Sequence, residues 1–216
     1  MDPLYLAIAL GPLSVYLLLL GAIHLTPRPF VTSGSRDAAA LGVGIGGLVI
    51  AGPLELFVPE TFAFVWGALV WVLLLLFYGL CLTLYVLVMR PRIVIYNVSR
   101  EVVRPLLANL VSDLDREARW AGECLVLPKL GVQLHIEAFP PMRVVQLIAA
   151  GPQQSYVGWR RLERALMPAL RQTPGSRHRL GYTLVGVGLA MVAFMAFLMV
   201  RDPETVAQSL REMLRF

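Results

Sequence analysis

Few side chains of this 216-residue chain stand in a spacing that supports catalysis or metal binding. His135-Ile-Glu137 has the H-x-E form of zinc deaminases, in which the histidine holds the metal and the glutamate moves protons. Those enzymes also need a downstream P-C-x-x-C, and no second cysteine follows Cys124. The motifs GxSxG, GxxxxGK[ST] and HExxH are absent as well. We therefore expect no catalytic residue, no metal and no cofactor, and we predict that the protein is not an enzyme.

Closely spaced glycines form a second candidate motif. Gly42-Val-Gly-Ile-Gly-Gly47 has the GxGxxG spacing of dinucleotide sites, but it lies inside an apolar run and not between a strand and a soluble helix. We interpret the glycines as helix-packing positions instead. Gly42 and Gly46 form a GxxxG pair, and Gly186 and Ala190 form a similar pair of small residues. The partner helix belongs either to this chain, which we favour, or to a second subunit.

One carboxylate falls inside an apolar run. Glu55 lies near the end of such a run, between Pro53 and Pro59. Ionisable side chains inside a membrane are costly and usually functional, so Glu55 is a candidate ion or substrate site on a kinked helix. Its position near the end of the run equally suits an anchor at the outer boundary of the membrane.

Arginines cluster late in the chain. At 100° per residue, Arg160, Arg164 and Arg171 fall within about 40° of one another on an amphipathic helix. Arg177 and Arg179 follow, just before the last apolar run. This basic stripe is a candidate site for anionic lipid head groups or for a protein partner. It also has an ordinary interpretation as a solvated helix face, and nucleic acid is disfavoured because no aromatic residues alternate with the charges.

The elements that carry these residues divide the chain into membrane and water-soluble parts. Hydrophobic residues make up 57% of the chain and charged residues 15%, against about 25% charged residues in ordinary soluble domains. Crossing a hydrocarbon core of about 30 Å takes roughly 20 apolar residues. Four runs are long enough, and the sequence therefore predicts four spans: Leu4–Ile23, Ala38–Val58, Phe62–Met89 and Leu180–Val200.

The placement of positive charge predicts the orientation. Of the 19 Lys and Arg residues, 16 lie in residues 24–37 and 90–179, on one side of the predicted spans. By the positive-inside rule that side is cytoplasmic and both termini lie outside. We thus expect a multi-pass protein of a bacterial inner membrane.

Residues 90–179 have the patterns of a small α+β domain. Strands are predicted at Ile93–Tyr96, Cys124–Leu127, Val132–Ala138 and Val144–Ala150, and helices at about 102–114 and 153–171. With a hairpin turn centred on Pro140 and Pro141, His135 would face Gln146. The fold class is therefore a four-helix membrane protein with a cytoplasmic β-α-β-β-β-α domain between its third and fourth spans. The predicted regions are a three-helix transmembrane region (1–89), the α+β domain (90–179), a fourth transmembrane helix (180–200) and an amphipathic tail helix (201–216).

Two hypotheses about function follow. The first is an interaction or scaffold subunit that presents the α+β domain at the membrane surface, with the bilayer, anionic lipid head groups, a protein partner or a second copy as its partners. The alternative is a small transporter or intramembrane enzyme that uses Glu55 and the Gly- and Pro-rich second helix.

Overall fold

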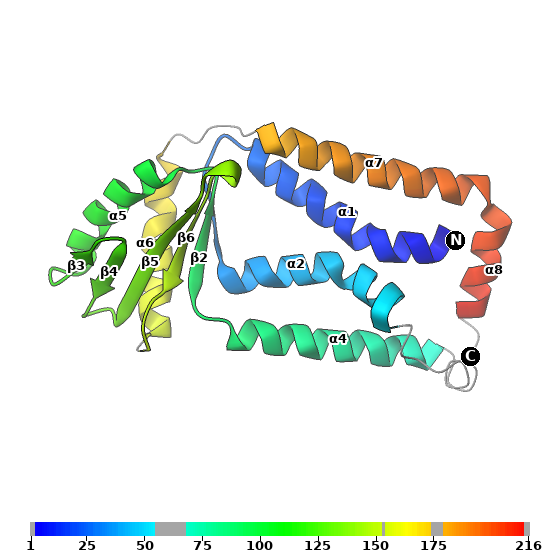
Figure 1. The fold of residues 1–216 in the computed structure, drawn as a ribbon, viewed down its shortest axis with the longest axis horizontal. Coiled ribbons are helices and arrows are strands. Elements are labelled where there is room, and N and C mark those ends of the chain that lie inside the picture. Colours follow the sequence, from blue (N-terminus) through cyan, green and yellow to red (C-terminus); the bar gives the residue numbers. More distant parts are fainter. Residues whose placement is uncertain (1–2, 55–67, 153, 174–178, 214–216) are drawn as a thin grey trace. The chain divides into compact units, whose positions relative to one another are not determined.

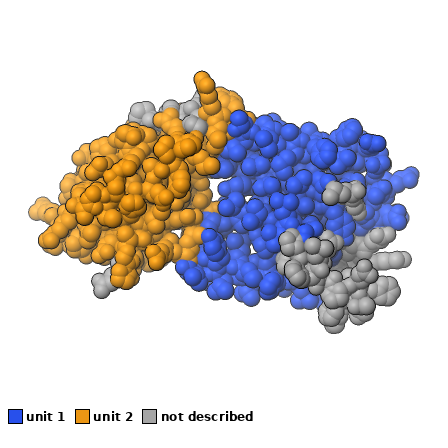
Figure 2. All heavy atoms as spheres, viewed as in Figure 1, with its two compact units in different colours: residues 1–20, 38–88, 183–216 blue, residues 21–37, 89–182 orange. Residues whose placement is uncertain are grey.

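The computed structural model describes residues 3–54, 68–152, 154–173 and 179–213. These residues form two compact units, which are coloured separately in Figure 2. The membrane unit comprises Met1–Leu20, Ala38–Val88 and Thr183–Phe216, and the sheet unit comprises Gly21–Asp37 and Met89–Tyr182. Each unit is described by itself below.

Within these described ranges, three helices are long and apolar enough to cross a membrane (Figure 1). They are α1 (Pro3–Leu25), α4 (Ala68–Val88) and α7 (Arg179–Arg201). Many apolar side chains of α4 are exposed, among them Leu76, Leu80 and Leu87. Water-soluble proteins rarely expose an apolar surface of this extent, so it fits contact with lipid. The chain thus combines helices suited to a membrane with a small α+β sheet region.

The predicted second span is not among these three candidates. Its described part is α2 (Gly34–Val49) followed by a short π-helix, η1 (Ile50–Leu54). Sixteen residues of α-helix extend about 24 Å, which is less than the hydrocarbon core. Proline cannot donate the backbone hydrogen bond of a regular helix, and Pro53 lies where the helix changes form. Residues 55–58 of the predicted span lie outside the described residues.

Glycines let α2 pack closely in the membrane unit. A Cβ on Gly47 would lie 2.7 Å from the carbonyl oxygen of Ala9, so α2 approaches the backbone of α1 directly. The other side of α2 meets α4, where the Tyr78 hydroxyl donates a hydrogen bond of 2.6 Å to the carbonyl oxygen of Gly42. The Tyr78 ring also lies against Gly46. Gly42 and Gly46 therefore contact a helix of the same chain.

The sheet unit is built on a six-stranded antiparallel sheet with the strand order β1-β2-β6-β5-β4-β3 (Figure 1). The strands are β1 (Phe30–Ser33), β2 (Arg92–Tyr96), β3 (Arg119–Ala121), β4 (Cys124–Leu127), β5 (Val132–Phe139) and β6 (Val144–Ala149). A 3-10 turn, η2 (Pro140–Met142), joins β5 to β6. The helices α5 (Arg100–Leu114) and α6 (Tyr156–Arg171) belong to the same unit, and α8 (Pro203–Met213) follows α7.

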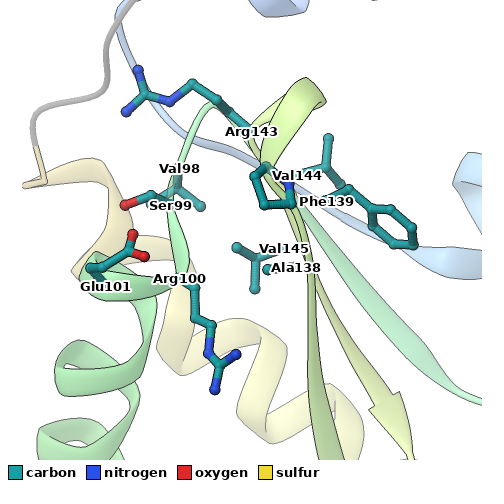
Figure 3. A pocket seen from close by; sticks show the side chains of 10 residues that line it. Val98, Ser99, Arg100, Glu101, Ala138, Phe139, Arg143, Val144 and Val145 are labelled. Atoms are coloured by element: carbon teal, nitrogen blue, oxygen red, sulfur yellow. The ribbon is translucent and has the colours of Figure 1, made fainter.

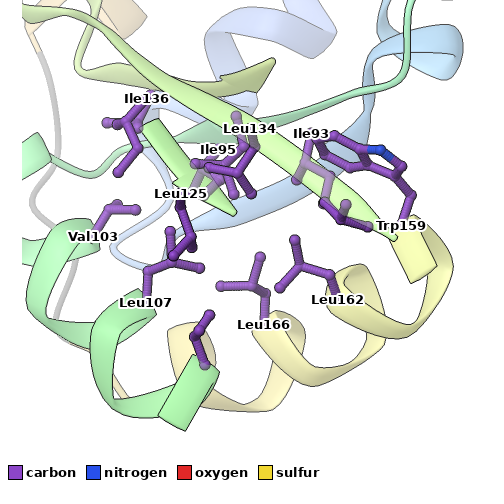
Figure 4. Close-up of a cluster of buried hydrophobic side chains, with 14 of the residues drawn as sticks. Ile93, Ile95, Val103, Leu107, Leu125, Leu134, Ile136, Trp159, Leu162 and Leu166 are labelled. Carbon is purple, nitrogen blue, oxygen red and sulfur yellow. The ribbon is translucent and has the colours of Figure 1, made fainter. Parts of the chain in front are cut away.

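One face of the sheet forms the hydrophobic core with α5 and α6 (Figure 4). Alternate residues of the strands point to this face because the side-chain period of a strand is two. The six side chains of β5 and β6 that alternate onto this face are all buried: Val132, Leu134, Ile136, Val145, Leu147 and Ala149. The helices contribute their own apolar stripes, among them Val103, Leu107, Leu162 and Leu166. A sheet layer and a helix layer around one core bury the apolar face of the sheet and the apolar stripes of both helices.

The predicted topology of this region lacked two strands. The segment around Thr32, for which no strand was predicted, forms β1 and pairs with β2, with Phe30 opposite Tyr96. β3 is also additional, and its three residues are all exposed, so it carries no apolar alternation that could reveal it. Each strand is too short for a pattern to be recognised before its pairing partner is known.

The predicted hairpin register was wrong by two residues. His135 pairs with Ile148, and Glu137 pairs with Gln146. The turn occupies Pro140–Met142 and is closed by Arg143 in the left-handed conformation, at φ 50°. The centre of the turn therefore lies one residue later than the two prolines suggested. A shift of two residues leaves every side chain on its original face, which explains why the core was still predicted correctly.

Candidate functional site

The basic stripe predicted on the last helix of the sheet unit lies on the exposed side of α6. Ser155 caps the helix by accepting a hydrogen bond from the backbone N–H of Gly158 at 3.2 Å. The helix then buries Trp159, Leu162, Leu166 and Leu170 in the core. Arg160, Arg164 and Arg171 are exposed on the opposite side. Arg179 is exposed at the start of α7, and Arg177 lies outside the described residues.

The guanidinium groups of α6 carry uncompensated charge. Within the described part of the chain, no carboxylate lies within 4.0 Å of Arg160, Arg161, Arg164 or Arg171. Four other cations of the unit are paired: Arg92 with Asp37 at 3.9 Å, Arg100 and Arg104 with Glu123, and Lys129 with Glu117 at 3.3 Å. The exposed side of α6 therefore attracts anions more strongly than the scattered cations of the unit do.

The structure adds three residues to this surface. Tyr156 and Val157, in the first turn of α6, are 66% and 74% exposed. The Arg160 guanidinium carbon lies 5.4 Å from the centre of the Tyr156 ring, and its Nε donates a hydrogen bond of 3.2 Å to the Tyr156 hydroxyl. Arg161 is exposed beside them. We call Tyr156, Val157, Arg160, Arg161, Arg164 and Arg171 the basic face.

The predicted helix already contained these three residues, but only the arginines within about 40° of one another were selected from it, and Arg161 lies about 100° from Arg160. At 100° per residue, Val157 and Arg161 still fall on the side of the helix away from its buried residues. Tyrosine and arginine are enriched in protein interfaces, since their rigid and partly polar groups bury much area at little entropic cost.

On the other side of the sheet, a polar cluster holds the ends of two helices that lead into the membrane unit. Asn97 Nδ2 donates hydrogen bonds to the carbonyl oxygens of Ile23, at 2.5 Å, and Thr26, at 3.1 Å. These carbonyls belong to the end of α1 or follow it directly, where helix hydrogen bonds run out. The Tyr96 hydroxyl donates to Asp37 Oδ1 in the first turn of α2 at 2.5 Å. The strand β2 is thus bound to both helix ends.

Aromatic packing strengthens this cluster. The His24 ring meets the Tyr96 ring edge-on, with centroids 5.6 Å apart, and both side chains are buried. Neighbouring residues of a strand point to opposite faces of the sheet. Ile95 points into the core with α5 and α6, so Tyr96 points to the other face. Within the sheet unit, the end of α1 and the basic face therefore lie on opposite sides of the sheet.

A cavity of about 310 Å³ lies between the start of α5 and the β5–β6 turn (Figure 3). Its lining combines apolar residues, such as Val98 and Val145, with Arg100, Glu101 and Arg143. Figure 3 shows the two guanidinium groups pointing to different ends of the cavity. The pKa of Glu101 lies below its ordinary value because the Ser99 hydroxyl and the Glu101 backbone N–H donate hydrogen bonds to its carboxylate. That carboxylate already supplies negative charge at the start of α5, so the cavity does not form a convergent anion site.

The remaining candidates are not brought together. Cys124 Sγ lies 3.7 Å from His135 Nδ1 across β4 and β5, and among the described residues no group of three or more metal-ligating side chains occurs. A Cβ added to Gly186 would meet no atom within 4 Å, and Ala190 is exposed, so this pair does not pack within the described chain. Glu55 lies outside the described residues.

Comparison with models of known protein families, with curated proteins and with solved structures found no match for this chain.

Proposed function

We propose that the protein is a membrane-anchored interaction subunit whose basic face binds an acidic segment of a protein partner. One observation carries this proposal: four arginines that pair with no carboxylate of the described residues share one side of α6 with an exposed tyrosine, across the sheet from the end of α1. A helix face that only had to stay soluble would gain from carboxylates four residues from its arginines. An acidic partner would supply these charges and would make charge-assisted hydrogen bonds with the guanidinium groups.

The position of the basic face favours a protein over a lipid as its partner. Asn97 and Tyr96 bind the ends of α1 and α2 on one side of the sheet, and α6 packs on the other. Arginines that bind lipid head groups act within about a Debye length of the membrane surface. The sheet and the body of α6 separate the basic face from the helix end at which the first candidate span leaves the membrane.

The topology proposed with this function has four spans and a cytoplasmic sheet unit. α2, η1 and the residues after them would form the second crossing, and the excess of arginine in residues 24–37 and 90–179 would face the cytoplasm of a bacterial cell. The residues that precede α1 and those that follow α7 would then lie outside.

A charge-reversal experiment tests the proposed function. The full chain carrying Arg160→Glu, Arg164→Glu and Arg171→Glu is isolated from its native membrane in mild detergent, beside the unmodified chain. We expect the variant to lose one or more co-purifying proteins that the unmodified chain retains, and this retention to weaken as salt is raised. Bound proteins and bound phospholipids are both quantified by mass spectrometry.

A matched variant controls for the change in net charge. Arg116→Glu, Arg119→Glu and Lys129→Glu reverse three exposed cations of the same unit that lie outside α6. The proposal requires this variant to retain its partners. It is wrong if both variants keep the same proteins, or if the α6 variant loses only anionic phospholipid. The transporter hypothesis predicts a different pattern, in which Glu55→Gln abolishes flux and both triple variants leave flux unchanged.

A further inference from the structure

The tip of the β5–β6 hairpin exposes an apolar segment to its surroundings. Phe139, Pro140, Pro141 and Met142 are all exposed, with fractions of 41% for Phe139 and 52% for Met142. Turns in water are normally polar, and a run of exposed apolar residues marks a surface that contacts something. The two prolines also restrict the backbone of this turn, which lowers the entropy lost when it is immobilised.

A second aromatic ring extends this surface. The strand pairings align Phe139 with Val144, Val144 with Tyr96, and Tyr96 with Phe30. Residues directly opposite one another in a sheet lie on the same face, so Phe30 and Phe139 share the face that lies across from α5 and α6. Phe30 is 44% exposed. We call Phe30, Phe139 and Met142 the apolar rim.

Hydrogen bonds tie the rim to the end of a candidate span. Asn97, next to Tyr96, binds the carbonyls of Ile23 and Thr26, and the Val98 N–H donates to the carbonyl oxygen of Arg143 at 3.2 Å. The apolar helix α1 ends at Leu25. The rim therefore lies beside the point at which α1 passes from hydrocarbon to water, where aromatic side chains are enriched in membrane proteins.

A positive charge flanks the rim. Arg28 is exposed two residues before Phe30. Long cationic side chains beside apolar ones suit the boundary of a bilayer, where phosphates lie just above the acyl chains. A protein groove would not account for the position of all these residues at the end of a membrane helix.

We infer that the apolar rim inserts into the membrane that α1 crosses, at the boundary between head groups and acyl chains, with Arg28 directed at lipid phosphates. Burial of apolar side chains in the bilayer then adds to the covalent links that hold the sheet unit at the membrane surface. This inference concerns the opposite side of the sheet from the basic face and does not depend on a protein partner.

Site-directed fluorescence in vesicles tests the inference. In a full chain with Cys81→Ala and Cys124→Ser, a single cysteine is introduced by Met142→Cys, labelled with the environment-sensitive dye NBD, and reconstituted into vesicles of phosphatidylcholine and phosphatidylglycerol. We expect blue-shifted emission and little quenching by iodide in water. Lipids brominated near the head group should quench the label more strongly than lipids brominated near the bilayer centre.

Two further labels make each outcome decisive. Val15→Cys, at an exposed position of α1, should be quenched best by deeply brominated lipids, and Val157→Cys on α6 should be quenched by iodide alone. The inference is overturned if the Met142→Cys label behaves like the Val157→Cys label. It is also overturned if the Met142→Cys label is shielded from iodide and lipid alike, which would indicate a second copy or a protein partner. Failure of brominated lipid to quench the Val15→Cys label would overturn it as well, since α1 would then not lie in the bilayer.

Discussion

Asn97 offers a sharp test of how the sheet unit is held to the end of α1. This residue is 1% exposed, has a left-handed backbone at φ 61°, and donates to two carbonyl oxygens. Two substitutions separate these features. Asn97→Gly removes the hydrogen bonds and keeps a residue suited to positive φ, whereas Asn97→Ala removes the hydrogen bonds and adds backbone strain.

The structure sets the size of each effect. Losing the two hydrogen bonds from Asn97 to the Ile23 and Thr26 carbonyls costs about 1–3 kcal/mol, at roughly 0.5–1.5 kcal/mol for each bond. A residue with a Cβ in the left-handed region costs about 1–2 kcal/mol more. With about 1.4 kcal/mol for each factor of ten, opening of this region should become about 5- to 150-fold more frequent in Asn97→Gly. In Asn97→Ala, opening should be roughly 5- to 30-fold more frequent than in Asn97→Gly.

Hydrogen exchange measured by mass spectrometry gives the opening frequency directly. A peptide covering residues 26–37 contains β1 and the start of α2, and its protection should fall in the order unmodified chain, Asn97→Gly, Asn97→Ala. A peptide covering α6 is the internal control and should exchange as before. Equal exchange in the two variants would refute the contribution assigned to backbone strain. Unchanged exchange in both would refute the conclusion that Asn97 holds the end of α1 against β2.

Two further predictions concern packing in the membrane unit and the effect of acid on the sheet unit. Gly47→Ala should lower stability in detergent by about 1–3 kcal/mol, because the added methyl group meets the α1 backbone. Gly186→Ala, which meets no neighbouring atom, should leave the thermal midpoint unchanged or slightly raised, and equal midpoints for the two variants would contradict the packing of α2 on α1. The pKa of Glu101 is lowered in the folded protein by the Ser99 hydroxyl, so its contribution to stability is present above the ordinary glutamate pKa and is lost as pH falls through the lowered value. Between pH 6 and pH 3 the thermal midpoint of Glu101→Gln should therefore fall less steeply with decreasing pH than that of the unmodified chain. An identical pH dependence of the two midpoints would contradict the stabilisation assigned to the Glu101 carboxylate.

Elements that repeat an apolar pattern over many residues were predictable from the sequence. The runs that became α1 and α7 show a continuous hydrophobic composition, and β5 and β6 alternate with a period of two. Because α6 carries an apolar stripe, its arginines could be assigned to the exposed side in advance. In each of these elements the apolar pattern indicates which surface is buried. Because the pattern is long, an error of a few residues at the ends of an element does not change this assignment.

Elements defined by distant partners could not be predicted. β1 has four residues and becomes a strand only because β2, more than sixty positions later, offers a free edge. Asn97 tolerates a left-handed backbone, but its hydrogen bonds join it to residues 74 and 71 positions earlier, at the end of α1, and a local pattern does not encode such a distant contact. The unneutralised charge on α6 likewise required the structure, since ion pairing depends on which carboxylates fold nearby.

The position of β1 changes how the sheet unit is attached to the membrane helices. A domain confined to residues 90–179 would be linked to membrane helices at two points, its beginning and its end. With Gly21–Asp37 included, the unit is linked at four points: the ends of α1 and α4 and the starts of α2 and α7. Asn97 binds the end of α1, while Tyr96 and Arg92 bind the first turn of α2, so two of these links are reinforced on the same side of the sheet. The layer on the other face of the sheet carries the basic face, which in the proposed function binds the acidic partner.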